Sequence, residues 1–563
     1  MRNGRCEMGD GRARPVRAAW LASGVAALSL LTSPISPLHG QSTRAERTNY
    51  TETSTHADVV AFIDSLARAA PGRLRRGMLE RTANGRVLPY VVVSRPLVRT
   101  PDVARASGKP IVYIQGDIHG GEVEGKESLQ AILRDLVLET RPNVLDSLVL
   151  IIVPIYNADG NDSLGPQARN RGAQNGPELV GQRANGEGRD LNRDYIKAEA
   201  PETRGSLEMF RDWDPDVFVD LHTTNGSFHG YGLTYSPSLH PAAMDGALAP
   251  AGPWTRDTLL PTLRARVRAR HGLETFDYGN FRGEFEGRDD PTSLRKGGWE
   301  TYEHKPRFGT NYFGLRNRIS VLSEAYSHDP FARRVEATTQ FVRELLSLLA
   351  EQRATVLART RGATRPAMGA AVPIRAEMTT RPFTAPVLVE ALEATGDSAR
   401  YEAGLRPGFR RTNRFVPVEM PVYDRFDATR TRALPTMWVI DATQRVAIDQ
   451  LVRHGFAFMQ IPDGRALPGE EFIVDSIIRA PRPFQGHQEV RVEGHWQPTE
   501  IVLGPGAVLV SVDQDNAILA AILLEPESDD GLTTWNFFDS ALTVGARHPV
   551  RRTNAVVRRG APR

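Results

Sequence analysis

The stretch "YIQGDIHGGEVEGKES", residues 113–128, places a histidine and a glutamate three residues apart at the end of an apolar run. His119 and Glu122 are separated by two glycines, which lack a Cβ and let the backbone turn so that both side chains can face one ion. An isolated His-x-x-Glu pair is common by chance and is equally compatible with a plain turn. The pair therefore predicts a metal site only if a third ligand lies elsewhere in the chain.

Two further polar residues also end apolar runs, namely His222 in "DVFVDLH" and Glu324 in "RISVLSE". In an open α/β sheet, ligands gather outside the carboxyl ends of the strands, so residues at such ends have a physical reason to converge. Two imidazoles and one carboxylate leave the fourth tetrahedral position of a zinc ion open for water, which is the arrangement of a catalytic zinc. The pattern favours a site built from His119, Glu122 and His222.

The elements that must position these residues alternate between short apolar runs and helical patterns over residues 55–349, as in an α/β protein. We expect buried strands at "KPIVYIQG", "SLVLIIVPIYN", "DVFVDLH" and "RISVLSEAYS", because these runs are short, rich in β-branched residues and bounded by turn residues. Helices are expected at residues 56–70, 121–139 and 332–360. A Gly/Asn/Arg-rich loop over residues 157–188 is too long for a simple connection, which indicates a functional role.

After about residue 365 the pattern becomes mainly strand-like, for example in "APVLVEAL", "FAFMQI", "GAVLVSVDQ" and "AILLEPES". The one clear helical pattern there is "TQRVAIDQLVRHG". This part of the chain therefore predicts a mainly β domain over residues 366–563.

The N-terminus has the pattern of a secretory signal peptide. Basic residues precede the apolar run "AAWLASGVAALSLL", and the polar stretch "TSPISPLHGQS" follows it. We expect residues 1–40 to be removed and the protein to be secreted or periplasmic, since no later run reaches the length of a membrane span. Cys6 is the only cysteine, so the mature chain has no disulfide and no thiolate ligand.

Other function classes lack their sequence signals. The formal net charge is +3, and no concentrated basic face indicates nucleic-acid binding. The sequence contains no His-Glu-x-x-His motif, no P-loop and no Gly-x-Ser-x-Gly nucleophile elbow. A serine hydrolase or a nucleotide-dependent enzyme is therefore disfavoured.

Four motifs occur in the order known from one family: "HGGE" after a strand, "DLNRDY" at residues 190–195, "DLHTTNG" at residues 220–226, and a strand that ends at Glu324. Over residues 55–349 the chain resembles the zinc metallocarboxypeptidases, with a carboxypeptidase A-like catalytic domain. The resemblance implies an α/β/α sandwich with a mixed central sheet for residues 41–365, followed by the smaller mainly β domain. It also implies one Zn²⁺ ion held by His119, Glu122 and His222.

The resemblance implies further roles around this ion. Glu324 matches the general base that takes a proton from a zinc-activated water and later delivers it to the leaving amine. Asp190 matches the carboxylate that orients a ligand imidazole through its other nitrogen. Asn192 and Arg193 match the pair that holds the substrate's terminal carboxylate, a task that suits the bidentate guanidinium.

Two of the implied roles, those of an arginine and a tyrosine, can each be filled by either of two residues. The family places an arginine that stabilises the oxyanion between a turn, here "NADG" at residues 157–160, and the Asn-Arg pair. Arg169 and Arg171 both qualify, and we prefer Arg171. A tyrosine ahead of the catalytic glutamate helps to bind the substrate; Tyr302 and Tyr312 both qualify, and we take Tyr312 although the local sequence does not decide between them.

The sequence therefore predicts an exported zinc metallocarboxypeptidase that acts on peptides or proteins with a free C-terminal carboxylate. Lys305 and Arg307, which precede Glu324, predict a preference for acidic C-terminal side chains. One alternative is a zinc-dependent amidase or deacylase acting on N-acyl amino acids or cell-wall peptides, because such enzymes share the ligand pattern. The other is a surface protein that binds peptides without turnover, which the intact ligand set together with Glu324 disfavours. The sequence does not indicate an oligomeric state.

Overall fold

The computed structural model describes residues 41–282, 297–363, 365–396, 408–460 and 464–555. The described residues belong to one compact unit. The expected signal peptide at residues 1–40 lies outside them. Within these described ranges, no helix combines the length and the apolar character that a membrane span needs.

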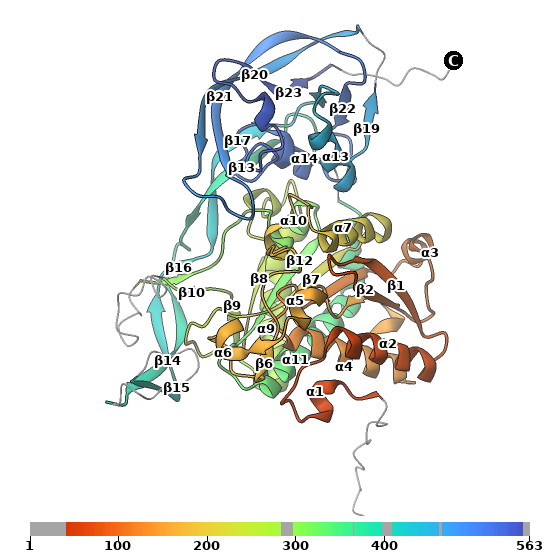
Figure 1. Cartoon of the computed structure of the whole chain (residues 1–563), viewed down its shortest axis with the longest axis vertical. Coiled ribbons are helices and arrows are strands. Elements are labelled where there is room, and N and C mark those ends of the chain that lie inside the picture. Colours follow the sequence, from red (N-terminus) through yellow and green to blue (C-terminus); the bar gives the residue numbers. More distant parts are fainter. Residues whose placement is uncertain (1–40, 283–296, 364, 397–407, 461–463, 556–563) are drawn as a thin grey trace, which may run out of the picture. The chain divides into compact units, whose positions relative to one another are not determined.

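A mixed sheet of eight strands lies at the centre of the first part of the chain (Figure 1). The strands, in order across the sheet, are β1 (Leu74–Arg81), β2 (Val87–Val93), β4 (Val149–Val153), β3 (Ile111–Gly116), β7 (Val217–Thr223), β12 (Ile319–Ala325), β8 (Leu233–Pro237) and β9 (Thr275–Asp277). Strands β4, β3, β7 and β12 run parallel to one another, whereas β1, β2 and β8 each pair antiparallel with a neighbour. The predicted α/β class with a mixed sheet is confirmed.

Every residue of the four parallel strands is buried. This burial explains their nearly continuous apolar sequences, because a strand covered on both faces does not alternate apolar and polar residues. On one side of the sheet, α4 (Glu124–Leu138) packs against α2 (His56–Ala69) and α11 (Phe331–Glu351). On the other side lie α7 (Pro201–Trp213) and α10 (Gly309–Leu315) (Figure 1).

The predicted strands correspond to β3, β4, β7 and β12, and two predicted helices correspond to α2 and α4. The helix expected over residues 332–360 is divided into α11 and α12 (Arg353–Thr360). The division lies at Gln352, whose backbone leaves the helical region with φ −102° and ψ 22°.

The C-terminal part is rich in β-structure, as predicted. Its largest sheet has six strands in the order β19 (Phe458–Gln460), β22 (Val508–Ser511), β18 (Met437–Ile440), β23 (Arg547–Thr553), β20 (Ala466–Arg479) and β21 (Val490–Val502). Two further antiparallel pairs are β13 (Ala371–Thr379) with β17 (Arg425–Ala433), and β14 (Ala385–Ala394) with β15 (Phe409–Met420). Helix α13 (Arg445–Arg453) forms at the predicted helical segment.

The strand expected at "AILLEPES" is wrong. Its apolar half belongs to helix α14 (Ala517–Leu524), and all eight residues of that helix are buried. A short apolar run without polar interruptions has neither a helical nor a strand period, so periodicity cannot distinguish a buried helix from a buried strand.

The two parts of the chain share a sheet and a core. Strand β11 (Trp299–Glu300) pairs antiparallel with β10 (Asn280–Phe281) and parallel with β16 (Val422–Tyr423). One apolar core extends from Val59 on α2 to Val550 on β23. The C-terminal part therefore packs directly against the part that carries the predicted site.

Candidate functional site

The predicted ligands lie where neighbouring strands end. His119 follows the end of β3 by three residues, and Glu122 lies two residues before the start of α4. His222 and Glu324 lie near the ends of β7 and β12, and the parallel register pairs them directly. The sheet thus brings residues about 100 positions apart in sequence to one edge.

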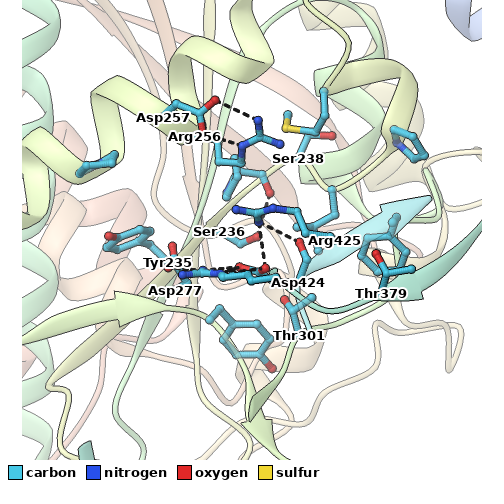
Figure 2. A pocket seen from close by; sticks show the side chains of 18 of the residues that line it. Tyr235, Ser236, Ser238, Arg256, Asp257, Asp277, Thr301, Thr379, Asp424 and Arg425 are labelled. Atoms are coloured by element: carbon cyan, nitrogen blue, oxygen red, sulfur yellow. Dashed lines mark hydrogen bonds and ion pairs between the residues drawn. The ribbon is translucent and has the colours of Figure 1, made fainter. Parts of the chain in front are cut away.

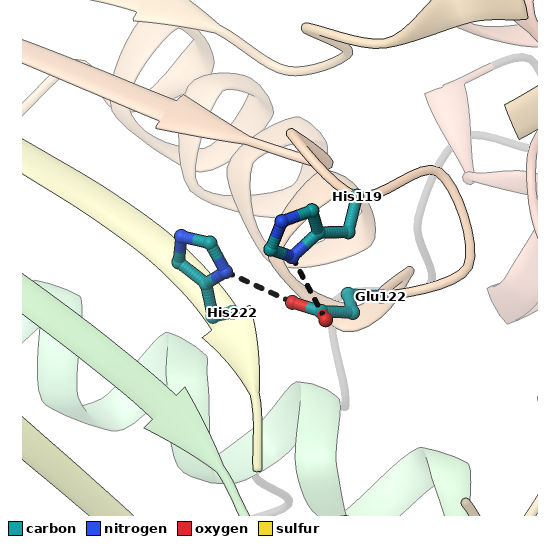
Figure 3. A group of neighbouring side chains, drawn as sticks. All are labelled: His119, Glu122 and His222. Carbon is teal, nitrogen blue, oxygen red and sulfur yellow. Dashed lines mark hydrogen bonds and ion pairs between the residues drawn. The ribbon is translucent and has the colours of Figure 1, made fainter. Parts of the chain in front are cut away.

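His119, Glu122 and His222 face one another (Figure 3). The Nδ1 atom of His119 is 3.0 Å from Glu122 Oε1, and the Nδ1 atom of His222 is 2.9 Å from Glu122 Oε2. All three side chains are buried, and one ligand atom from each lies within 4.8 Å of the others. Two imidazoles and a carboxylate form the donor set of a catalytic zinc, so this group can hold a metal ion.

The second ring nitrogen of each histidine faces a carboxylate. His119 Nε2 is 3.1 Å from Asp190 Oδ1, and His222 Nε2 is 3.0 Å from Asp220 Oδ2. Such carboxylates fix the orientation of an imidazole, which here directs both Nδ1 atoms toward Glu122. Asp190 was predicted, but Asp220 was missed. The sequence could have indicated Asp220, because it lies two residues before His222 and residues two apart on a strand point to the same face.

The charges in this group are strongly coupled. Burial favours the neutral form of Glu122, but the charges of His119 and Arg171 outweigh it and lower the pKa of Glu122 well below its usual range. Burial disfavours the charged form of His222, but Asp220 and Glu122 raise its pKa well above the usual value. The group therefore keeps its carboxylate ionised, as a cation site requires.

A pocket of about 80 Å³ opens beside these residues. The residues that line it include six that were predicted from the sequence, namely His119, Glu122, Asn192, Arg193, His222 and Glu324. The structure thus brings the expected metal ligands, the expected base and the Asn-Arg pair to one small space.

Glu324 is almost completely buried in this pocket, with 7% of its surface exposed. Burial raises the pKa of Glu324 to about 8; the charge of His222 opposes this rise, and that of Glu122 adds to it. A carboxyl group with a pKa in this range can both accept and return a proton near neutral pH, which is the requirement for a general acid and base.

Asn192 and Arg193 are held in different ways. The Oδ1 atom of Asn192 accepts a hydrogen bond from the backbone N–H of Gly309 at 3.0 Å, which fixes the amide. The guanidinium of Arg193 lies over the ring of Phe308, with Cζ 3.9 Å from the ring centre. A stacked guanidinium keeps its N–H groups in its own plane, so they remain available to an anion.

The structure brings Arg171, rather than Arg169, to the metal-ligand group. Arg171 Nη1 is 2.9 Å from Glu122 Oε1, whereas Arg169 Nε donates to Asn170 in the short helix α6 (Gln167–Asn170). Arg183 was missed: it lines the pocket, and its Nε donates to Asp190 Oδ2 at 2.9 Å. No sequence signal separates Arg183 from the other arginines of its loop.

Tyr312 does not reach this pocket. It is fully buried in α10, and its hydroxyl is 2.8 Å from His454 Nδ1 in the C-terminal part. Tyr302 lines the pocket instead, and its buried hydroxyl has no hydrogen-bond partner among the described residues. The structure therefore contradicts the placement of Tyr312 in the site, because its hydroxyl is engaged in the core, and it places Tyr302 in the pocket.

Comparison with known proteins agrees with this geometry. A family model described as "Zinc carboxypeptidase" matches residues 59–247, which include the three candidate ligands and the Asn-Arg pair. The part of the chain that carries the candidate ligands is therefore a zinc carboxypeptidase domain. This match and the relatives below support a metallopeptidase.

The relatives that the comparison finds are distant in sequence. The chain is 22% identical over 490 residues to "Carboxypeptidase 2" of Trichophyton tonsurans, covering 84% of this chain and 81% of that protein. It is 22% identical over 509 residues to "Carboxypeptidase 2" of Trichophyton equinum, covering 87% and 85%. A metallo-carboxypeptidase structure from Burkholderia cenocepacia matches 53% of this chain and 70% of its own at 16% identity, with a TM-score of 0.38.

Lys305 and Arg307 are not among the residues that line the candidate pocket. Lys305 Nζ is 3.2 Å from Glu303, and the guanidinium of Arg307 pairs with Asp530 and Glu489. Their positions give no support to the expected preference for acidic C-terminal side chains.

A second cavity, of about 1610 Å³, is much larger than the candidate site (Figure 2). It lies between α9 (Leu260–His271) and the β13–β17 pair, and Tyr278 lines both spaces. Its charged residues pair with one another, as Arg381 does with Asp277 at 2.6 Å and Arg425 does with Asp424 at 2.9 Å. The metal-ligand group lies in the smaller pocket, which is therefore the candidate active site.

Proposed function

We propose that the protein is an exported, zinc-dependent carboxypeptidase that removes C-terminal residues from peptides with a free terminal carboxylate. The observation that carries the proposal is the convergence of the metal-ligand group, Glu324 and Arg193 on one small pocket. The relatives named carboxypeptidase 2 support the same activity.

His119, Glu122 and His222 fit a zinc ion, because their donor atoms lie close together and Asp190 and Asp220 orient the two imidazoles. A zinc ion at this position supplies Lewis-acid chemistry and lowers the pKa of water to about 7. The chain's own residues supply binding, orientation and proton transfer around it.

Arg193 and Asn192 bind the terminal carboxylate of the substrate, since a guanidinium and an amide N–H₂ donate to both carboxylate oxygens. The Tyr302 hydroxyl adds a third donor. Glu324 removes a proton from the attacking water and then delivers it to the nitrogen of the leaving amine. Arg171 stabilises the negative charge that develops on the scissile carbonyl oxygen.

The proposal includes the organisation of the chain. Residues 1–40 form a secretory signal peptide, residues 41–365 the catalytic domain and residues 366–563 a β-rich C-terminal domain. The basic, apolar and polar succession at the N-terminus supports export to a secreted or periplasmic location.

The test uses the purified mature protein loaded with zinc and a set of short peptides, each present as the free acid and as the C-terminal amide. Mass spectrometry should show loss of single C-terminal residues from the free acids only. Chelator-treated protein and the Glu324→Gln variant should release nothing.

Other results would point elsewhere. Release of acyl groups from N-acyl amino acids without cleavage of ordinary peptides would favour the amidase or deacylase. Binding of peptides by the metal-loaded protein without any product would favour the non-catalytic surface protein. Cleavage that persists after complete metal removal would contradict the assignment of the site.

A further inference from the structure

A loop of the C-terminal part contacts the segment that carries Asn192 and Arg193. Residues 480–489 connect β20 and β21, and the side-chain oxygen of Gln485 accepts a hydrogen bond from the backbone N–H of Asp190 at 2.9 Å. In the same loop, His487 Nε2 is 3.0 Å from Glu199 Oε1. The loop therefore contacts both the first and the last residue of the segment 190–199.

Further contacts from the C-terminal part fix the same segment. His454 Nε2 is 3.0 Å from the carbonyl oxygen of Ile196, and Lys197 Nζ lies 4.0 Å from the ring centre of Trp535. Because these contacts come from three separate elements, the segment has little freedom to move apart from the C-terminal part.

The adjacent wall of the pocket, which includes Phe308, is also attached to the C-terminal part. The backbone N–H of Arg307 donates to Asp530 Oδ2 at 2.7 Å, and its guanidinium donates to Asp530 Oδ1 at 2.8 Å. Both residues are buried, so this charged pair is shielded from water and fixed in geometry. The Nη1 atom of Arg307 also donates to Glu489 at 2.7 Å.

Arg307 directly precedes Phe308, the ring on which the Arg193 guanidinium lies. In the same wall, Thr301 directly precedes Tyr302. The backbone N–H of Thr301 donates to the carbonyl oxygen of Tyr423 in the C-terminal part at 3.0 Å. Phe308 and Tyr302, the two aromatic residues of this wall that line the pocket, therefore each directly follow a residue that is hydrogen-bonded to the C-terminal part.

The metal-ligand group has a different set of partners. Within the described ranges, the hydrogen-bond and ion-pair partners of the His119, Glu122 and His222 side chains lie between residues 119 and 223. The described residues of the C-terminal part thus make no direct hydrogen bond or ion pair with the ligand side chains, and they approach them only through the backbone of Asp190, whose carboxylate lies against His119.

We propose that the C-terminal part positions the substrate-carboxylate side of the active site, with Gln485 and Asp530 as positioning residues for Arg193 and the Phe308 wall. This inference rests on the proposed function. Residues 366–563 then act as a component of the catalytic unit that sets affinity for the substrate's terminal carboxylate, and they leave metal binding to the first part of the chain.

The experiment measures kcat, KM and bound zinc for Gln485→Ala and Asp530→Asn in the full mature protein, with one free-acid peptide as substrate. We expect KM to rise about tenfold in each variant, because a hydrogen bond that holds the binding residues is lost. We expect kcat to change by less than about threefold and the zinc content to stay at one ion per chain.

Two further variants make the readout specific. Gln485→Glu keeps an oxygen that accepts from the Asp190 N–H, and it should restore KM to within about threefold of the wild type. Gln488→Ala is the matched control, since Gln488 lies in the same loop, is exposed and donates to Ala480 within its own hairpin. It should leave KM unchanged.

Thermal unfolding checks that each variant is folded. Asp530 is completely buried, whereas Gln485 is partly exposed, so Gln485→Ala decides the outcome if Asp530→Asn does not fold. Equal KM values for Gln485→Ala and Gln488→Ala overturn the inference, as does loss of zinc from folded Gln485→Ala. If the wild type cleaves no free-acid peptide, the proposed function fails and this inference fails with it. If the wild type cleaves the peptide and the folded variants have an unchanged KM, the inference alone is overturned.

Discussion

The two sides of the small pocket are built in different ways. On the metal side, three buried ligands contact partners within about 100 residues, near the ends of adjacent strands. On the substrate side, Arg193 ends the short 3-10 helix Leu191–Arg193, and Tyr302 lies outside any helix or strand. The N-cap of that helix, Asp190, contacts Gln485, which is 295 positions away. The difference indicates that chemistry depends on the central sheet, whereas recognition of the substrate depends on both parts of the chain.

The largest expected effect comes from removing one ligand of the metal side. In His222→Ala, we expect zinc content to fall to a small fraction of one ion per chain and peptide cleavage to be lost, because two ligands hold zinc far more weakly than three. Metal analysis after dialysis and a peptide assay measure both. His495→Ala, a change of an exposed histidine on β21, serves as the matched control; a zinc content in His222→Ala equal to that of this control would place the metal elsewhere.

A change of the base on the same side should separate chemistry from metal binding. We expect Glu324→Gln to lower kcat by about 10³-fold, because an amide cannot take up the proton. Zinc content should stay unchanged, since Glu324 is not one of the three ligands. Single-turnover assays with parallel metal analysis give both values, and a kcat above one tenth of the wild type would remove Glu324 from its proposed role.

The metal side was also the part that the sequence predicted best. His119, Glu122, His222 and Glu324 each follow or end an apolar run, and the ends of parallel strands meet at one edge, so their convergence followed from local patterns. The structure brings them together, and their chemical roles stay predictions. Asp220 could have been added by the alternation of side chains along β7.

On the substrate side, the two candidate tyrosines provide a direct comparison. We expect Tyr302→Phe to raise KM several-fold, because Tyr302 lines the pocket and its hydroxyl has no hydrogen-bond partner among the described residues. Tyr312→Phe should leave KM unchanged and lower the free energy of unfolding by about 1 kcal/mol, since it removes the hydrogen bond to His454. Steady-state kinetics and urea unfolding test the pair, and the reverse pattern would restore Tyr312 to the site.

The smallest expected effect on activity concerns Glu202, which supports the loop before Asp190. Its Oε2 accepts from Asn185 Nδ2 at 3.1 Å, and Asn185 Oδ1 accepts from the backbone N–H of Arg189 at 2.9 Å. Burial raises the pKa of Glu202 from 4.5 to about 7, so the folded protein keeps a proton that the unfolded chain releases above pH 4.5. Its contribution to stability is therefore complete below pH 4.5 and is lost as the pH rises through 7.

Urea unfolding between pH 5 and 8 measures this contribution. The wild type should lose about 1–3 kcal/mol more stability over this interval than Glu202→Gln, whose amide does not titrate. Peptide cleavage by the variant should match the wild type. An identical pH dependence of stability in both proteins would show that Glu202 is ionised in the folded state.

The substrate side could not be predicted from the sequence to the same extent. Gln485 and Asp530 have no local pattern that relates them to Asp190 or Arg307, because their contacts depend on how the C-terminal part packs. Tyr302 and Tyr312 are only ten positions apart, and neither local sequence shows which one reaches the site; the contact of Tyr312 in α10 with His454 separates them. Helix α14 was misread for a related reason, since its uniform apolar sequence reflects burial rather than element type.

The central claim is that the substrate side recognises a free terminal carboxylate through Arg193. The most direct test is the ratio of kcat/KM for a free-acid peptide to that for its C-terminal amide, measured in the wild type and in Arg193→Ala at equal zinc content. We expect a ratio of about 100 or more in the wild type and a fall to below about 10 in the variant, because the charge-assisted bidentate contact is lost. A ratio that stays the same in both proteins would contradict the account.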